Sequence, residues 1–119
     1  MSKMRLFLTH WNKTEAADIA SSLIKMGQDV IGVESSDGAR AVRLIKETIP
    51  DTVVVYLARL PSHGLETARA LRSVKWARTI PIVFVAESGE THEKAKLKVA
   101  DAIYAASSAL KAILARASK

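Results

Sequence analysis

Cysteine is absent from this sequence of 119 residues. Its absence excludes disulfide bonds and thiolate metal sites, and it leaves the redox compartment open. Long hydrophobic runs are also missing, since no apolar stretch approaches the roughly 20 residues that a membrane helix needs. The apolar stretch near the basic amino terminus is too short for a secretion signal. We therefore expect a soluble, cytoplasmic protein that makes no contact with a membrane.

The sequence also lacks runs of like charge, glycine-rich phosphate loops, and the Ser-His-Asp or Cys-His arrangements of nucleophilic enzymes. It has instead an ordinary globular composition, with 49% hydrophobic and 25% charged residues. A chain of this length has room for one hydrophobic core. No linker, repeat or low-complexity segment divides it, so we predict a single domain over residues 1–119.

A net charge of +6 raises the question of nucleic-acid binding. The 18 lysines and arginines are spread over every predicted helix. The simpler interpretation is a set of solvated helix faces, a phosphate-binding face is the alternative, and nucleic acid is the less favoured partner. Two groups of basic residues recur at helical spacing on the expected solvent sides of their helices: Arg40, Arg43 and Lys46, and Arg69, Arg72 and Lys75.

Five apolar segments alternate with five amphipathic ones. We predict strands at residues 5–9, 29–34, 53–58, 80–86 and 101–105, and helices near residues 14–26, 39–48, 64–75, 91–99 and 107–117. The third and fourth strands are apolar throughout, which is typical of strands buried on both faces. This alternation predicts an α/β fold, a doubly wound five-stranded parallel sheet with helices on both faces. Among such sheets, the strand order 2-1-3-4-5 is favoured at this length.

Local signals mark several helix ends. Asn12 or Thr14 can cap the first helix, and Gly27 can end it in the left-handed conformation. Ser35-Ser36-Asp37-Gly38 is a turn sequence and supplies a cap for the second helix. Pro50 ends that helix, because the residue before a proline is pushed out of the α region.

The stretch from Pro50 to Gly64 carries a family pattern. Pro50-Asp51 leads an apolar strand that ends eight residues before Gly64, and Leu65-Glu66 follow. With these motifs in this order and spacing, the whole chain resembles the receiver domain of bacterial response regulators. The resemblance implies a flavodoxin-like (CheY-like) fold. Weaker matches are Asp37-Gly38 after the second strand, Ile80-Pro81-Ile82 opening the fourth, and Ala100-Asp101 before the fifth.

The same resemblance argues against the reaction of that family. Its phosphotransfer uses Mg²⁺ held by two acidic residues after strand one and by the acceptor aspartate after strand three, and a Ser or Thr and a Lys that hold the phosphoryl oxygens. A shift of the alignment by one residue would place Leu57 at the position of the acceptor aspartate or Ser107 at the position of the lysine. Leu57 is not an aspartate and Ser107 is not a lysine, so the shift does not restore the site. We predict no catalytic residue, no metal and no cofactor. The matching positions here, all of them degenerate, are His10, Trp11, Tyr56, Ala86 and Ala106.

Aromatic residues and histidines gather at the predicted active edge. His10 and His63 would both lie there, which permits a weak metal hypothesis, although exposed loop histidines are the simpler interpretation. Tyr56 and Trp11 could stack and fill the volume of the missing acidic groups, metal and phosphate. A small-ligand site or a partner anchor is the alternative. Trp76 is expected to cover the core.

These observations predict a pseudo-receiver, a non-enzymatic signalling module of the two-component (phosphorelay) type that binds a protein partner without being phosphorylated. A small basic nucleic-acid-binding protein is the alternative. The family switch couples the Ser or Thr to an aromatic residue on strand five. That coupling should be absent, because Ala86 has no hydroxyl and the matching residue is Ile103 or, with a shift, Tyr104. The family output surface, helix 4, strand 5 and helix 5, would bind the partner or a second copy in a homodimer; its candidate residues are Lys94, Lys98, Tyr104, Ala105 and Lys111.

Overall fold

The computed structural model describes residues 4–57, 61–86, 99, 102–106 and 109–110. Five parallel strands form one sheet in the order β2-β1-β3-β4-β5, so the predicted fold class and strand order are confirmed. The strands are β1 (Arg5–Thr9), β2 (Asp29–Glu34), β3 (Thr52–Tyr56), β4 (Ile82–Val85) and β5 (Ile103–Ala105).

In the described part of the chain, three α-helices and one short 3₁₀ helix follow the first three strands. They are α1 (Lys13–Lys25), α2 (Gly38–Thr48), α3 (Pro61–Arg72) and the 3₁₀ helix η1 (Lys75–Ala77). The third helix begins at Pro61 rather than near Gly64, because proline is favoured in the first turn of a helix, where its missing N–H costs nothing. The helices predicted near residues 91–99 and 107–117 fall almost wholly outside the described residues.

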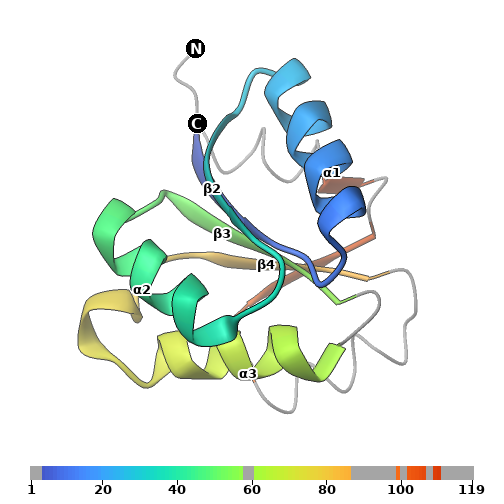
Figure 1. Ribbon diagram of the computed structural model, residues 1–119. Coiled ribbons are helices and arrows are strands. Elements are labelled where there is room, and N and C mark those ends of the chain that lie inside the picture. The colour runs from blue at the N-terminus through green and yellow to red at the C-terminus, as the bar shows by residue number, and fades with distance from the viewer. Residues whose placement is uncertain (1–3, 58–60, 87–98, 100–101, 107–108, 111–119) are drawn as a thin grey trace.

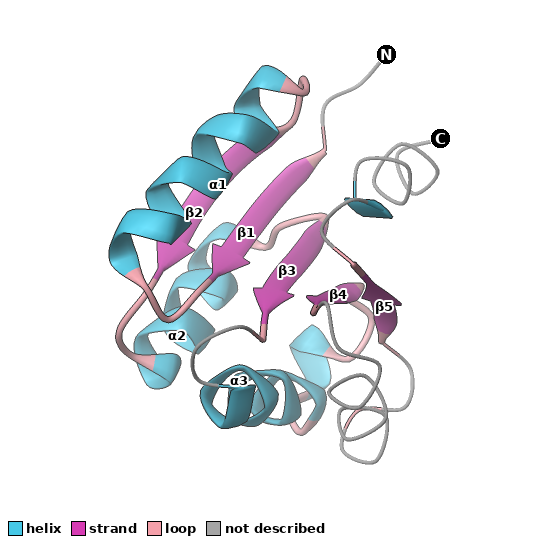
Figure 2. Cartoon of the chain, turned by 90° about the vertical axis from the view of Figure 1, so that its right-hand side faces the viewer, coloured by secondary structure: helices cyan, strands magenta, loops and turns pink. Residues whose placement is uncertain are grey.

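The sheet separates two hydrophobic layers (Figures 1 and 2). On one face, Phe7, Val53, Val55 and Phe84 pack against α2 and α3. On the other face, their strand neighbours pack toward α1. Side chains of a strand alternate between the two faces, so a strand in the middle of such a sheet must be apolar at every position. This explains why β3 is buried from end to end. The strand residues of the second layer are Leu6, Leu8, Val54, Tyr56, Val83, Val85 and Ala105.

The predicted helix caps are present. The side chain of Asn12 accepts a hydrogen bond from the Glu15 amide at 3.0 Å. The carboxylate of Asp37 accepts from the amides of Ala39 and Arg40. Gly27 follows α1 with a φ of +92°, in the left-handed region that glycine occupies without strain.

Gly64 allows α3 to approach β3 closely. A Cβ atom on Gly64 would lie 2.9 Å from Val55 Cγ1 and 3.0 Å from Leu57 Cδ2, which is too near unless these side chains or the helix shift. The glycine that closes the family-like stretch therefore has a packing reason. Trp76, in η1, is half-buried against the same layer, as predicted. No helix in the described part of the chain is long and apolar enough to cross a membrane.

Candidate functional site

The carboxyl ends of β1, β3 and β4 lie side by side, since the strands are parallel. Thr9 pairs with Val55, and Tyr56 pairs with Val85. His10, Tyr56 and Ala86 therefore reach one edge of the sheet, as the sequence predicts. Ligands of open α/β sheets bind at this edge, so it is the first place to look for a site.

His10 is buried, with 2% of its surface exposed, rather than an exposed loop histidine as expected. Its backbone amide donates to the Glu34 carbonyl at 3.2 Å. Its Nδ1 accepts from the Asn12 amide at 3.1 Å, and its Nε2 lies 3.9 Å from Glu15 Oε2. Because Nδ1 accepts this hydrogen bond, the neutral ring carries its proton on Nε2. The imidazole thus fixes the entry into α1.

Two ring pairs lie at this edge, and each of them includes a histidine. Tyr56 and His10 have ring centroids 5.2 Å apart at an interplanar angle of 31°. Trp11 and His63 are 5.5 Å apart and nearly perpendicular, at 89°. The prediction that Tyr56 and Trp11 stack on one another is replaced by this arrangement. The reason is the alternation of the strand, which turns Tyr56 toward the α1 layer, whereas Trp11 lies toward α2 and α3.

The metal hypothesis for His10 and His63 gains no support from this geometry. His10 lies against Tyr56, whereas the exposed His63 of α3 lies against Trp11. Nδ1 of His10 is already engaged with the Asn12 amide. Among the described residues, no group of three or more His, Cys, Asp or Glu side chains could hold a metal ion.

The other positions matched to the receiver pocket carry alanine. Ala86 is 8% exposed, and its amide donates to the Ala105 carbonyl at 3.0 Å, which continues the pairing of β4 with β5. Ala106 follows β5 and is half-buried. Neither side chain can donate a hydrogen bond. This part of the edge offers backbone atoms and methyl groups only.

The predicted partner face needs correction where it is described. Ala105 is buried, at 4% exposure, because it packs in the α1 layer of the core. Tyr104 is half-buried; its ring stacks on Phe84 at 5.6 Å and its hydroxyl donates to the Val99 carbonyl. Neither residue presents a free side chain to a partner. The exposed residue of β5 is instead Ile103, at 41%. Lys94, Lys98 and Lys111 lie outside the described residues.

The two basic groups differ in their surroundings. Arg40, Arg43 and Lys46 are exposed on α2, as predicted. Arg72 is half-buried, and its Nη1 donates to the Ala77 carbonyl at 3.1 Å, so it holds the turn after α3. Arg69 lies 3.3 Å from Glu66 on the same helix. Arg69 and Arg72 are therefore engaged within the protein, whereas Lys75 lies in η1 and is exposed.

Glu34 is a buried acidic residue whose importance the sequence did not reveal. It is 5% exposed, and its Oε2 accepts from the Ser36 amide, the Ser36 hydroxyl and the Asp37 amide at 3.0 to 3.1 Å. The carboxylate thus holds the loop between β2 and α2 from inside. The one signal for it is a glutamate that directly precedes a Ser-Ser-Asp-Gly turn.

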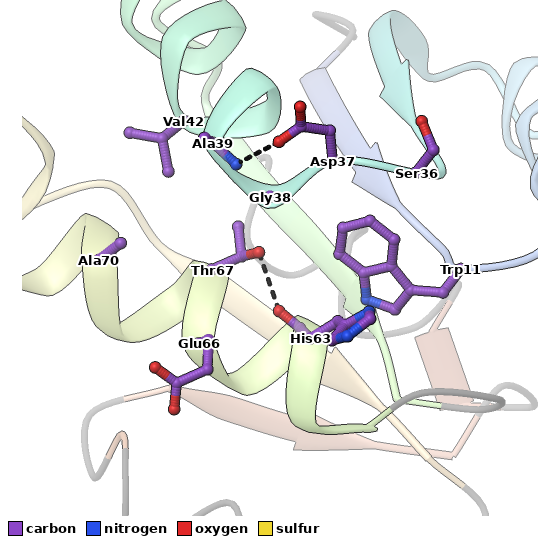
Figure 3. Close-up of a pocket in the computed structure, with 10 residues that line it drawn as sticks. All are labelled: Trp11, Ser36, Asp37, Gly38, Ala39, Val42, His63, Glu66, Thr67 and Ala70. Carbon is purple, nitrogen blue, oxygen red and sulfur yellow. Dashed lines mark hydrogen bonds between the residues drawn. The ribbon is translucent and has the colours of Figure 1, made fainter.

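A cavity of about 420 Å³ opens beside this loop, between the start of α2 and one side of α3 (Figure 3). Trp11 and His63 border it near the edge of the sheet, and Val42 and Ala70 border it between the helices. No sequence motif pointed to this cavity. It exists because Trp11, the loop after β2 and the first half of α3 meet only in the folded chain.

Comparison with known proteins identifies the fold. No protein-family model matches the sequence, and no curated protein matches it. Solved structures do resemble it over almost its whole length. The signal receiver domain of a modulated diguanylate cyclase from Desulfovibrio desulfuricans G20 is 27% identical, with a TM-score of 0.71 over 98% of this chain and 90% of that one.

Two further receiver domains are similar. That of a sensor histidine kinase from Pseudomonas aeruginosa, with magnesium coordinated in its active site cleft, is 24% identical with a TM-score of 0.77, over 97% of both chains. The BeF₃-activated receiver domain of RstA from Klebsiella pneumoniae is 24% identical with a TM-score of 0.71, over 94% of this chain and 93% of that one. The structural neighbours of this chain are thus response-regulator receiver domains.

The residues at this edge do not fit the magnesium site that the receiver fold implies. A hard cation such as Mg²⁺ takes oxygen ligands, chiefly carboxylates. The matched positions supply an imidazole, an indole and a phenol ring from His10, Trp11 and Tyr56, and all three are buried. The carboxylate of Glu15 borders this group, but it lies beside His10 Nε2. These side chains therefore give no basis for a magnesium-dependent step.

Proposed function

We propose that this chain is a receiver-type signalling domain of the two-component class that recognises a protein partner without being phosphorylated. The observation that carries the proposal is Tyr56. Its buried ring packs on His10 at the end of β3, in the place that the family resemblance assigns to the acceptor aspartate. A phenol there has no carboxylate to receive a phosphoryl group.

The surroundings of Tyr56 support the same proposal. The phosphoryl oxygens of a receiver need a hydroxyl after β4 and a lysine after β5, and here Ala86 and Ala106 stand at those matches. The receiver fold remains intact around the edge, with the full five-stranded sheet. A preserved fold without its reactive groups is suited to recognition. Regulation would then come from a partner with different affinities for two states of the domain.

A titration with beryllofluoride and Mg²⁺ tests this function. We expect the backbone amide NMR spectrum to stay unchanged, because no carboxylate is available to bind the phosphoryl analogue at Tyr56. The Klebsiella receiver domain, which is BeF₃-activated, provides the positive control under identical conditions. Saturable shifts clustered at His10, Tyr56 and Ala86 would contradict the proposal. So would acid-labile incorporation of phosphate from acetyl phosphate.

The exposed row Arg40, Arg43 and Lys46 is the observation that favours the alternative, nucleic-acid binding. Two facts weigh against it. Arg40 lies 3.9 Å from the buried carboxylate of Glu34, and Arg69 and Arg72 of the second basic group are engaged within α3 and the turn after it. A row of three cations on one helix is also common on solvated faces. Protein recognition is therefore the better-supported function.

A further inference from the structure

The cavity between α2 and α3 has the size of a small-molecule site. Its volume of about 420 Å³ lies within the range of roughly 300 to 1,000 Å³ that is typical of ligand pockets. It is distinct from the Tyr56 and His10 pair, which packs on the opposite face of the sheet. The two helices meet tightly at its floor, since a Cβ on Gly38 would lie 2.8 Å from Thr67 Oγ1.

Apolar groups make up much of the wall. The ring of Trp11 forms one side, and Val42, Ala39 and Ala70 extend the apolar surface along the helices (Figure 3). Trp11 is 9% exposed, and its buried indole Nε1 has no hydrogen-bond partner. A flat apolar ligand would have a matching surface on this indole.

The charged groups of the wall favour a cation. Asp37 and Glu66 both line the cavity, and no lysine or arginine in the described part of the chain does so; Arg69, which lies 3.3 Å from Glu66, is outside the cavity wall. The first amides of α2 offer little to an anion, because Asp37 Oδ1 already accepts from Ala39 and Arg40 at 2.9 and 3.2 Å. An anion would meet two carboxylates instead of free N–H groups. A cation would meet one of these carboxylates at either end of the cavity, and the face of an indole, to which cations are attracted.

We propose that this cavity binds a small organic cation with a flat, apolar body. The ammonium or amidinium group would lie beside one of the two acidic side chains, Asp37 at the start of α2 or Glu66 on α3, and the body would lie along Trp11 and between the helices. This inference goes beyond the proposed signalling function and does not depend on it, since a protein-binding domain could carry such a site or lack it.

Three probes of nearly equal size test the charge preference: benzamidinium, neutral benzamide and benzoate. Binding is followed by the indole N–H signal of Trp11 and the amide signals of Ala39 and Thr67. We expect saturable shifts with benzamidinium at a dissociation constant of about 1 mM, the range of a fragment with few heavy atoms. Benzamide should bind more weakly, and benzoate should not bind.

Two pairs of variants separate the cavity from the rest of the surface. Asp37→Asn with Glu66→Gln should weaken benzamidinium binding at least about threefold, the scale of partly exposed ion pairs, while asparagine keeps the helix cap. Asp18→Asn with Glu47→Gln removes the same charge from exposed positions outside the cavity wall and should change nothing. Ala70→Leu should block binding, whereas Ala17→Leu, on exposed α1, should not.

The amide spectrum of each variant shows directly whether it is folded. Benzoate binding as tightly as benzamidinium would overturn the proposal. Equal weakening by the two charge pairs would overturn it too, as would shifts that spread over the surface without saturation.

Discussion

Ile49 shows how one residue can be held in an unfavourable conformation by its surroundings. It ends α2 with a φ of 43°, in the left-handed region, which β-branched residues rarely adopt. The guanidinium of Arg5 donates to the carbonyls of Ile49 and Thr48 at 2.9 and 2.7 Å. Asp51 in turn accepts from the Arg5 amide at 2.8 Å. These contacts fix the turn, and the isoleucine adopts the backbone conformation that they require.

Replacing Ile49 with asparagine should stabilise the protein. Asparagine tolerates the left-handed region, and the strain of a β-branched residue there is about 1 to 2 kcal/mol. Ile49 is 48% exposed, so part of this gain is offset by lost apolar burial. We expect the free energy of unfolding in urea to rise by about 0.5 kcal/mol.

Ile24→Asn is the matched control, because Ile24 is an exposed isoleucine within α1. Asparagine is a poorer helix former than isoleucine, so this variant should be slightly destabilised. A loss of stability in Ile49→Asn as large as that in Ile24→Asn would show that Ile49 carries no strain.

Tyr56 shows what a single position reveals before the fold is known. Its place at the end of β3, as matched to the acceptor aspartate, followed from the spacing to Gly64. Its neighbours did not follow from the sequence, because the alternation of side chains along β3 decides that it meets His10 and not Trp11. The sequence therefore predicted a bulky ring at this position, but it did not predict that the ring would contact His10.

At the scale of elements, the junction between β2 and α2 depends on one internal carboxylate. Glu34 accepts three hydrogen bonds from Ser36 and Asp37, and Asp37 then caps α2. The same short loop forms one wall of the cavity. The turn residues predicted this loop and its cap, but the role of Glu34 became visible only in the fold.

Glu34→Ala should destabilise the protein by about 2 to 3 kcal/mol, because it leaves the donors of Ser36 and Asp37 without their charged acceptor. Glu34→Gln keeps an acceptor oxygen and should cost less. Urea unfolding measures both values. Glu47→Ala, on the exposed side of α2, is the control and should stay within about 0.5 kcal/mol of the unmodified protein. Equal stability of Glu34→Ala and the control would show that the loop does not need this carboxylate.

For the whole molecule, the net charge of +6 is the property that most needs an explanation. Exposed basic residues are found on α1, on α2 and after η1, so the charge is not gathered on one element. A dispersed positive charge supports solubility and weak, non-specific attraction to polyanions. Specific nucleic-acid binding would instead depend on a defined face.

Two triple substitutions distinguish non-specific attraction from specific nucleic-acid binding in a filter-binding assay on duplex DNA. The first changes the α2 row and the second changes exposed residues elsewhere. Each phosphate contact contributes about 0.9 to the slope of log affinity against log salt. We expect any retention at low salt to be weakened equally by both. Loss of binding with the first triple alone would favour the nucleic-acid function. The triples are Arg40, Arg43 and Lys46 to Gln, and Lys13, Lys25 and Arg78 to Gln.

The sequence by itself determined the α/β class and most element boundaries, because strand composition, helical periodicity and caps are local properties that each segment carries alone. The strand order followed from the order favoured among doubly wound sheets of this length. The sequence also determined that His10, Tyr56 and Ala86 share one edge, since parallel strands bring their ends together. The tertiary structure alone decided the ring pairs, the burial of Ala105, the carboxylate inside the β2–α2 loop and the cavity beside Trp11. These features depend on how helices and loops distant in sequence pack on the sheet, and no local pattern encodes that packing.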